Sequence, residues 1–382
     1  MRIRNALVVV GMLAGVAAAV PAQAAATPGG WPQTGYGPGH TGYNPSESVI
    51  NARSVGGLTN RWTVRASLYP EGCEPVPEPP LVWDGRMFLL DSGSISGYDV
   101  VSGKKLWTYE ATYFDGFGMA VSGGLVLGTE RNCFSNSNYD TNVVAIDPRT
   151  GKEVWHQLQG YSIETSVADA GVFVVSGYCG VCDDEEHGVT AFRVSDGKPL
   201  WRQVSRALAG PVAANGKIVL RDPRNHRIEV VDIRTGDPLV GGVERRVAAA
   251  SPAGDRFYLF DTAGIAAVDA STLTVRWTVA RESGDLITDG RRVFVASANR
   301  INAYDANTGR LSWTRALADP SHLIRAGGLL YALSGRKLVI LAPATGRSVV
   351  SAAAYGTVTD QVVVTGGRLF TTNGATVRAY TP

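Results

Sequence analysis

Four cysteines, Cys73, Cys133, Cys179 and Cys182, are the residues of this chain with the widest range of chemistry. Cys179 and Cys182 form a C-x-x-C pair with three open interpretations: a short-loop disulfide, a metal site completed by the other two cysteines, or a redox-active pair. A disulfide is favoured because the spacing to the other cysteines is irregular for a metal site. No helix that would stabilise a thiolate is predicted there. Asp183 follows Cys182, which excludes a haem-attachment motif. We expect Cys73–Cys133 to be a second disulfide that joins two loops.

An acidic run follows the last cysteine directly. It consists of Asp183, Asp184, Glu185, Glu186 and His187. One interpretation is a solvated loop tip, and the other is a calcium or similar hard-cation site, because carboxylates are the preferred ligands of such ions. A neighbouring polar loop could add oxygens from Asn136, Asn138, Asp140 and Asn142. That loop lacks the glycine and the terminal glutamate of an EF-hand.

No motif of the chain predicts a catalytic residue. The histidines are scattered, at His40, His156, His187, His226 and His322, without the fixed spacing of a metal site. Neither a G-x-S-x-G elbow nor a G-x-G-x-x-G loop between strand and helix is visible. The cofactor-binding positions are therefore unknown. Trp31 and Trp83 fall outside the repeated tryptophan position described below and are freer for other roles.

The first 24 residues have the features of a cleaved export signal. Arg2 and Arg4 precede an apolar run over 6–20, and Ala22-Gln23-Ala24 fits an A-x-A cleavage site. No apolar stretch is long enough for a good membrane span. With 36 Lys and Arg against 34 Asp and Glu, the chain is near neutral, which argues against a nucleic-acid partner. The Ala, Gly and Arg usage is typical of a high-GC bacterium. We expect a secreted, soluble, monomeric protein.

A repeat of roughly 40 residues dominates the chain after residue 57 and is typical of radial or stacked folds. Its best copies read A-x-D-x-x-T-G-x-x-x-W, as in 145–155 and 303–313. The aspartate and glycine predict a tight turn, and the tryptophan predicts packing between adjacent sheets. The repeat positions are Trp62, Asp99, Gly103, Trp107, Asp147, Gly151, Trp155, Gly197, Trp201, Asp232, Gly236, Asp269, Trp277, Asp305, Gly309, Trp313 and Gly346.

Three copies depart from the consensus. Valine stands in the tryptophan position at Val240 and Val350. Leu273 stands where glycine is expected, so we expect the turn at Leu273 to differ from the others. At the regular copies, a β-branched residue in place of Gly151 or Gly309 should destabilise the protein by roughly 1–3 kcal/mol because of the positive φ.

The two chain ends supply one further unit between them. The segment 58–64 matches 273–279 at six of seven positions, so it predicts an outer strand without inner partners. A hairpin at 362–370 and a strand at 376–380 predict those partners. Seven internal units and this shared one predict an all-β, eight-bladed propeller of four-stranded antiparallel blades, closed by both termini.

The repeat resembles that of the pyrroloquinoline quinone (PQQ) propeller superfamily, and the start Trp31-Pro32-Gln33 through Asn44-Pro45 resembles the start of such propellers. Together with the export signal, this gives three predicted parts: a signal at 1–24, an N-terminal segment at 25–56 and a propeller at 57–382. It implies either a dehydrogenase of alcohols or sugars that uses PQQ and calcium, or a non-catalytic protein like the propeller lipoprotein of outer-membrane assembly. Compact blades and the lack of a Cys-Cys pair favour the non-catalytic class, and no cofactor is predicted.

Long loops mark the first blades. The tryptophan position recurs at 62, 107, 155 and 201, and then at shorter spacings of 36–39 residues. All four cysteines lie in the long intervals, in loops that should share one face of a propeller. We therefore expect a disulfide-stapled face that binds an unknown protein, glycan or small molecule.

Overall fold

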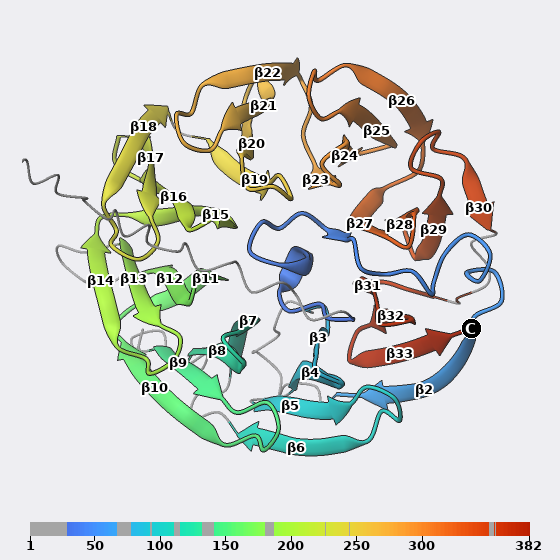
Figure 1. Ribbon diagram of the computed structural model, residues 1–382, viewed down its shortest axis with the longest axis horizontal. Helices are drawn as coiled ribbons and strands as arrows, with labels where there is room; N and C mark the ends of the chain where they lie inside the picture. The colour runs from blue at the N-terminus through green and yellow to red at the C-terminus, as the bar shows by residue number, and fades with distance from the viewer. Residues whose placement is uncertain are drawn as a thin grey trace, which may run out of the picture.

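The computed structural model describes residues 29–66, 78–91, 94–110, 115–131, 141–179, 187–225, 227–243, 245–350, 355 and 357–382. These residues form eight antiparallel sheets arranged as blades around one axis (Figure 1). Each blade has its first strand at the axis and its last at the rim. The predicted eight-bladed propeller is confirmed. A 3-10 turn, η1 (Thr34–Tyr36), lies near the start of the described residues.

Seven blades are built from consecutive strands. In chain order they are β3–β6 (Leu81–Trp83, Arg86–Asp91, Ser94–Asp99, Lys105–Glu110), β7–β10 (Asp115–Ser122, Leu125–Arg131, Thr141–Ile146, Glu153–Gln159), β11–β14 (Ser162–Asp169, Val172–Tyr178, His187–Arg193, Pro199–Val204), β15–β18 (Ala207–Ala214, Lys217–Asp222, Arg227–Asp232, Pro238–Val243), β19–β22 (Arg246–Ala250, Arg256–Asp261, Gly264–Asp269, Val275–Ala280), β23–β26 (Asp285–Thr288, Arg292–Ser297, Arg300–Asp305, Leu311–Ala316) and β27–β30 (Pro320–Ala326, Leu329–Ser334, Lys337–Leu341, Ser348–Val350).

The eighth blade joins the two ends of the chain, as predicted. Strand β2 (Thr59–Arg65) is its outer strand and pairs antiparallel with β33 (Thr376–Thr381), with Trp62 opposite Ala379. Strands β31 (Val362–Thr365) and β32 (Arg368–Asn373) complete it. A parallel pairing that the repeat does not predict joins β1 (Tyr43–Asn44) to the inner strand β27.

The repeated tryptophan joins most blades to the blade that follows. In six blades its indole Nε1–H donates to a backbone carbonyl in the turn of the following blade, over 2.8–3.3 Å. The glycine of that turn has a φ of +68° to +73°. A Cβ there would lie only 2.6–2.8 Å from the indole. Glycine is therefore required by both backbone and packing. The six pairs are Trp62–Gly103, Trp107–Gly151, Trp155–Gly197, Trp201–Gly236, Trp277–Gly309 and Trp313–Gly346.

The turn at Leu273 corrects one expectation. Leu273 adopts a φ of +55°, and its N–H donates to the Asp269 carbonyl over 2.9 Å, as the glycines do in the equivalent turns. The turn is therefore the same, although leucine is disfavoured in it. The preceding blade has Val240 in place of tryptophan. The Leu273 side chain packs over β18 there, in the space that an indole fills elsewhere.

Chain direction gives the propeller two distinct faces. The repeat turns and the hairpins between first and second strands lie on one, here called the turn face. The loops between blades and those between second and third strands lie on the other, here called the loop face.

Candidate functional site

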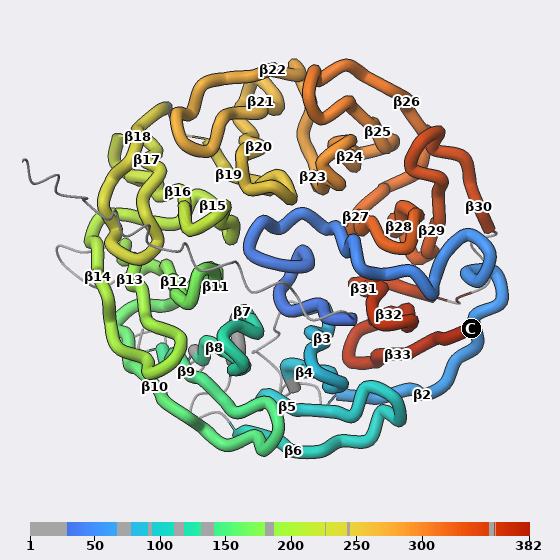
Figure 2. The backbone as a smooth tube through the Cα atoms, viewed as in Figure 1, coloured from blue at the N-terminus to red at the C-terminus, as the bar shows by residue number. Residues whose placement is uncertain are grey.

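A short segment closes the central channel near the turn face. The hub segment, defined as Trp31–Asn44, runs inside the ring (Figure 2) and bonds to the end of the innermost strand of every blade. In order, the contacts are Trp31 with Val82, Pro32 with Val121, Gln33 with Ala168, Pro38 with Ala213, Gly39 with Ala250, Thr41 with Thr288, Gly42 with Arg325, and Asn44 with Val364. One segment therefore holds all eight blades at the axis.

A cavity of about 250 Å³ lies above the hub segment. Its floor includes Trp31, Thr34 and His40, and its walls are mostly the first residues of inner strands β19, β23, β27 and β31, where those strands begin at the loop face. The apolar part of the wall comes from Ala248, Leu286, Ile287, Leu323, Ile324 and Val362. The cavity is a blind funnel, because the hub segment blocks the other end.

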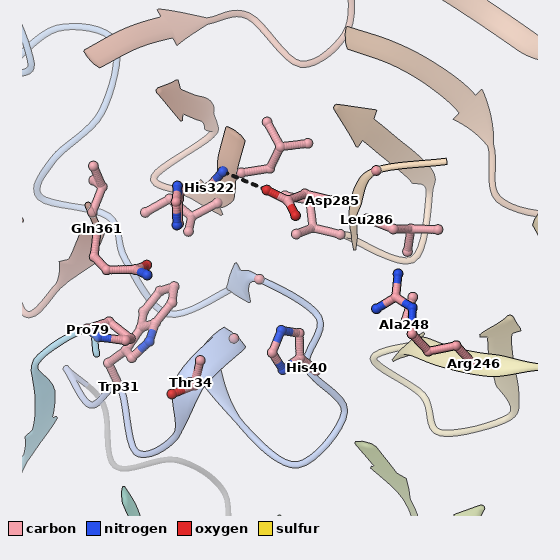
Figure 3. A pocket seen from close by; sticks show the side chains of 17 residues that line it. Trp31, Thr34, His40, Pro79, Arg246, Ala248, Asp285, Leu286, His322 and Gln361 are labelled. Atoms are coloured by element: carbon pink, nitrogen blue, oxygen red, sulfur yellow. Dashed lines mark hydrogen bonds between the residues drawn. The ribbon is translucent and has the colours of Figure 1, made fainter. Parts of the chain in front are cut away.

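Polar groups meet across this funnel. In the view of Figure 3, Trp31 and Gln361 lie at one end and Arg246 at the other, with other polar side chains between them. The Asp285 Oδ2 accepts the backbone N–H of His322 over 2.9 Å, which fixes the carboxylate at the wall. Arg246 is exposed to the funnel and takes part in none of the ion pairs formed among the described residues.

His40 is held neutral on the funnel floor. Loss of hydration lowers the pKa of its imidazole, Asp285 partly opposes this, and the positive charge of Arg246 lowers the pKa further. A Cβ on Gly35 would lie 2.6 Å from the His40 ring, so only glycine leaves room for the ring there. A neutral imidazole offers one donor and one acceptor.

Glu78 lies just before β3, close to the funnel lining at Pro79. Burial raises the pKa of its carboxyl to about 7, although the backbone N–H groups of Met119 and Gly118 lower it. The Met119 N–H donates to Glu78 Oε2 over 3.4 Å. This carboxyl therefore titrates near neutral pH.

The residues predicted from motifs lie elsewhere. Cys73, Cys133, Cys182, Asp140 and the acidic run 183–186 are outside the described residues. Cys179 is buried at the end of β12, on the loop-face side, and is not a free thiol. His187 begins β13 and packs against the Tyr178 ring, at 5.1 Å between centroids. No group of three metal-ligating side chains is present in the described part of the chain.

Sequence reasoning missed the funnel because its residues come from distant segments. No sequence motif links His40 to His322, yet both line the cavity. The one available signal was the position of Trp31 outside the repeat.

One protein family covers most of the described propeller. The family described as outer membrane protein assembly factor BamB matches residues 59–238 and 238–381. This chain belongs to that family. The resemblance to PQQ-like propellers is thereby confirmed.

Individual relatives include enzymes. The chain is 30% identical over 168 residues to a quinohemoprotein alcohol dehydrogenase of Comamonas testosteroni, covering 41% of this chain and 23% of the enzyme. The crystal structure of the Comamonas testosteroni quinohemoprotein alcohol dehydrogenase aligns with a TM-score of 0.65 at 14% identity, over 92% of this chain and 80% of that one. BamB of Moraxella catarrhalis aligns with a TM-score of 0.61 at 18% identity, over 85% and 98%. These structural matches show the fold. The chain spans about a quarter of the length of the curated relatives it matches.

The lining of the funnel does not suit the calcium that the resemblance implied. Calcium takes six to eight oxygen ligands. Among the described residues that line the funnel, Asp285 is the only carboxylate, and one of its oxygens already accepts the His322 N–H. We therefore derive no redox step from this site.

No helix of the described residues is long and apolar enough to cross a membrane.

Proposed function

We propose that the chain is an exported, non-catalytic binding propeller that takes a small ligand into the funnel above the hub segment. The observation that carries the proposal is the funnel itself: a blind cavity with polar groups at both ends and an apolar wall between them. A few placed polar groups in an apolar concavity are the common pattern of ligand sites. At about 250 Å³, the funnel suits a ligand smaller than a typical drug.

Export and the disulfides belong to the same proposal. The predicted signal at 1–24 supports export, and the family description names an outer-membrane assembly factor. Cys179, buried and not free, supports a disulfide on the loop face. We propose pairing with Cys182 and a second bridge between Cys73 and Cys133. Peptide mass spectrometry without reduction tests both bridges and the mature N-terminus.

A thermal-shift screen of the purified mature chain tests the binding function. The screen should contain small acids, sugars, amino acids, and PQQ with calcium. We expect at least one small molecule to raise the melting temperature, and Ile287→Trp, which narrows the funnel, to abolish the rise. Failure of every compound class would contradict the proposal.

A quinoprotein dehydrogenase is the second candidate, favoured by the identity to the Comamonas testosteroni enzyme. After incubation with PQQ and calcium, a quinone absorbance retained at one per chain, with dye-linked oxidation of alcohols or sugars, would establish it in place of the binding protein.

A further inference from the structure

The funnel lining holds a cation that has no carboxylate partner among the described residues. Arg246 presents a guanidinium and Gln361 an amide, whereas Asp285, the one carboxylate of the described lining, already accepts the His322 N–H. A ligand that completes these groups must therefore bring acceptor oxygens. This points to an anion or a ligand rich in carbonyl and carboxylate oxygens.

The strongest single donor is Arg246 at the mouth of β19. Its guanidinium lies 5.1 Å from the centre of the Phe260 ring, a cation–π contact that orients the side chain. No carboxylate of the described residues pairs with it. A planar guanidinium with free donors binds a carboxylate through two parallel hydrogen bonds.

The opposite end of the funnel holds a side-chain amide that can bind a ligand. Gln361 is half-buried there, beside the ring of Trp31, whose Nε1 is closed to solvent. The Gln361 backbone is bonded to Thr372, which leaves the side-chain amide beside Trp31 for the same ligand.

Resting on the proposed binding function, we propose that the ligand is a small organic acid that spans the funnel. Its carboxylate binds Arg246, and an oxygen at its far end accepts from the side-chain amide of Gln361. Asp285 lies between the two ends, where it can accept a hydroxyl of the ligand but repels a second charge at mid-length. This arrangement selects acids with a charge at the end and a neutral or hydroxylated middle.

Calorimetric titration of the mature chain with succinate and malate tests the proposal. Succinamide, in which amides replace both carboxylates, is the matched neutral compound. We expect one acid to bind at one per chain and succinamide to bind at least tenfold more weakly. Equal binding of succinate and succinamide would overturn the inference, as would the absence of binding by either acid at millimolar concentration.

Two substitutions locate the site. Arg246→Met should weaken acid binding at least tenfold. Arg246→Lys should give an intermediate loss, because lysine keeps the charge but cannot donate two parallel hydrogen bonds to a carboxylate. Arg291→Met removes an exposed charge in a turn-face hairpin and should leave binding within twofold. If Arg246→Met and Arg291→Met weakened acid binding equally, the acid would be attracted by the overall charge of the protein and not by Arg246, and the inference would be wrong. Circular dichroism of each variant excludes unfolding as the cause.

The same experiment separates this inference from the function beneath it. If succinamide or glucose bound and Ile287→Trp blocked that binding, the acid specificity would be wrong while the funnel remained a binding site. If the chain bound PQQ with calcium and oxidised alcohols, both the acid specificity and the non-catalytic binding function would be wrong.

Discussion

The rim and the hub of this propeller are stabilised in different ways. At the rim, the same tryptophan–glycine contact recurs in six blades, with one geometry and one hydrogen bond. At the hub, the single segment Trp31–Asn44 contacts each blade differently, through backbone in some places and through Gln33 or Asn44 side chains in others. Repeated contacts join the blades at the rim, whereas the non-repeated segment forms the floor of the funnel.

Closure of the ring is the most sensitive part of the rim. A chain that ends at Asn373 lacks β33, so β2 loses its only partner strand and β32 gains an open edge. We expect aggregation or loss of cooperative unfolding, because unpaired edges promote association. Size-exclusion chromatography and a thermal melt measure this. A monomer with an unchanged melting temperature would show that the rim does not depend on closure.

A glycine substitution separates backbone strain from the indole contact. Gly309→Val places a β-branched residue at φ +69° and a Cβ 2.8 Å from the Trp277 ring, so we expect a loss of roughly 2–5 kcal/mol. Gly328→Val is the matched control, since Gly328 has φ +76° but open space around it. Its loss should be about 1–3 kcal/mol, from strain alone. Equal losses in denaturant melts would mean that the indole contact adds nothing.

The hub should respond to the loss of a single side chain. The amide of Gln33 donates to the Ala168 carbonyl over 2.8 Å and accepts the Ala168 N–H over 3.2 Å. Gln33→Met keeps the volume but leaves both buried backbone groups without partners, at a cost of about 2–3 kcal/mol. Because the funnel floor is part of the same segment, ligand binding should weaken as well. Gly309→Val, at the rim, should lower stability without affecting binding, and the reverse pattern would contradict the distinction between rim and hub.

The interface that contains Val240 and Leu273 tests whether the tryptophan–glycine contact can be restored where the sequence lacks it. Val240→Trp alone should destabilise the protein, because Leu273 occupies the space of the indole. Adding Leu273→Gly should restore stability by recreating the regular pair. We expect a coupling free energy of about 1–2 kcal/mol in the double-mutant cycle. Additive effects would show that Val240 and Leu273 do not compensate for each other.

The rim was predictable from the sequence because its physics repeats. An aspartate, a glycine and a tryptophan at fixed spacing specify a turn and a packing contact, and seven internal units with the shared one at the chain ends specify the ring. The exception at Leu273 was predicted wrongly, because the sequence alone did not reveal that Val240 in the preceding blade leaves room for it. The funnel was not predictable, since His40, Arg246, Asp285 and His322 come together only once the ring is closed.

The smallest expected effect comes from Glu78, and it tests whether the surroundings of this carboxyl beside the funnel are desolvated. Its carboxyl has a folded pKa of about 7, above the ordinary value of 4.5, because burial disfavours the charge. Between these two pH values the folded protein binds more protons than the unfolded chain, so the contribution of Glu78 to stability falls as the pH rises. Glu78→Gln should therefore raise stability by about 1 kcal/mol at pH 8 and change it little at pH 4. Thermal melts of both proteins across this range measure the difference. A rim substitution such as Gly309→Val, which carries no titrating group, should lower stability equally at both ends of the pH range. A pH-independent effect of Glu78→Gln would mean that this carboxyl is not desolvated beside the funnel.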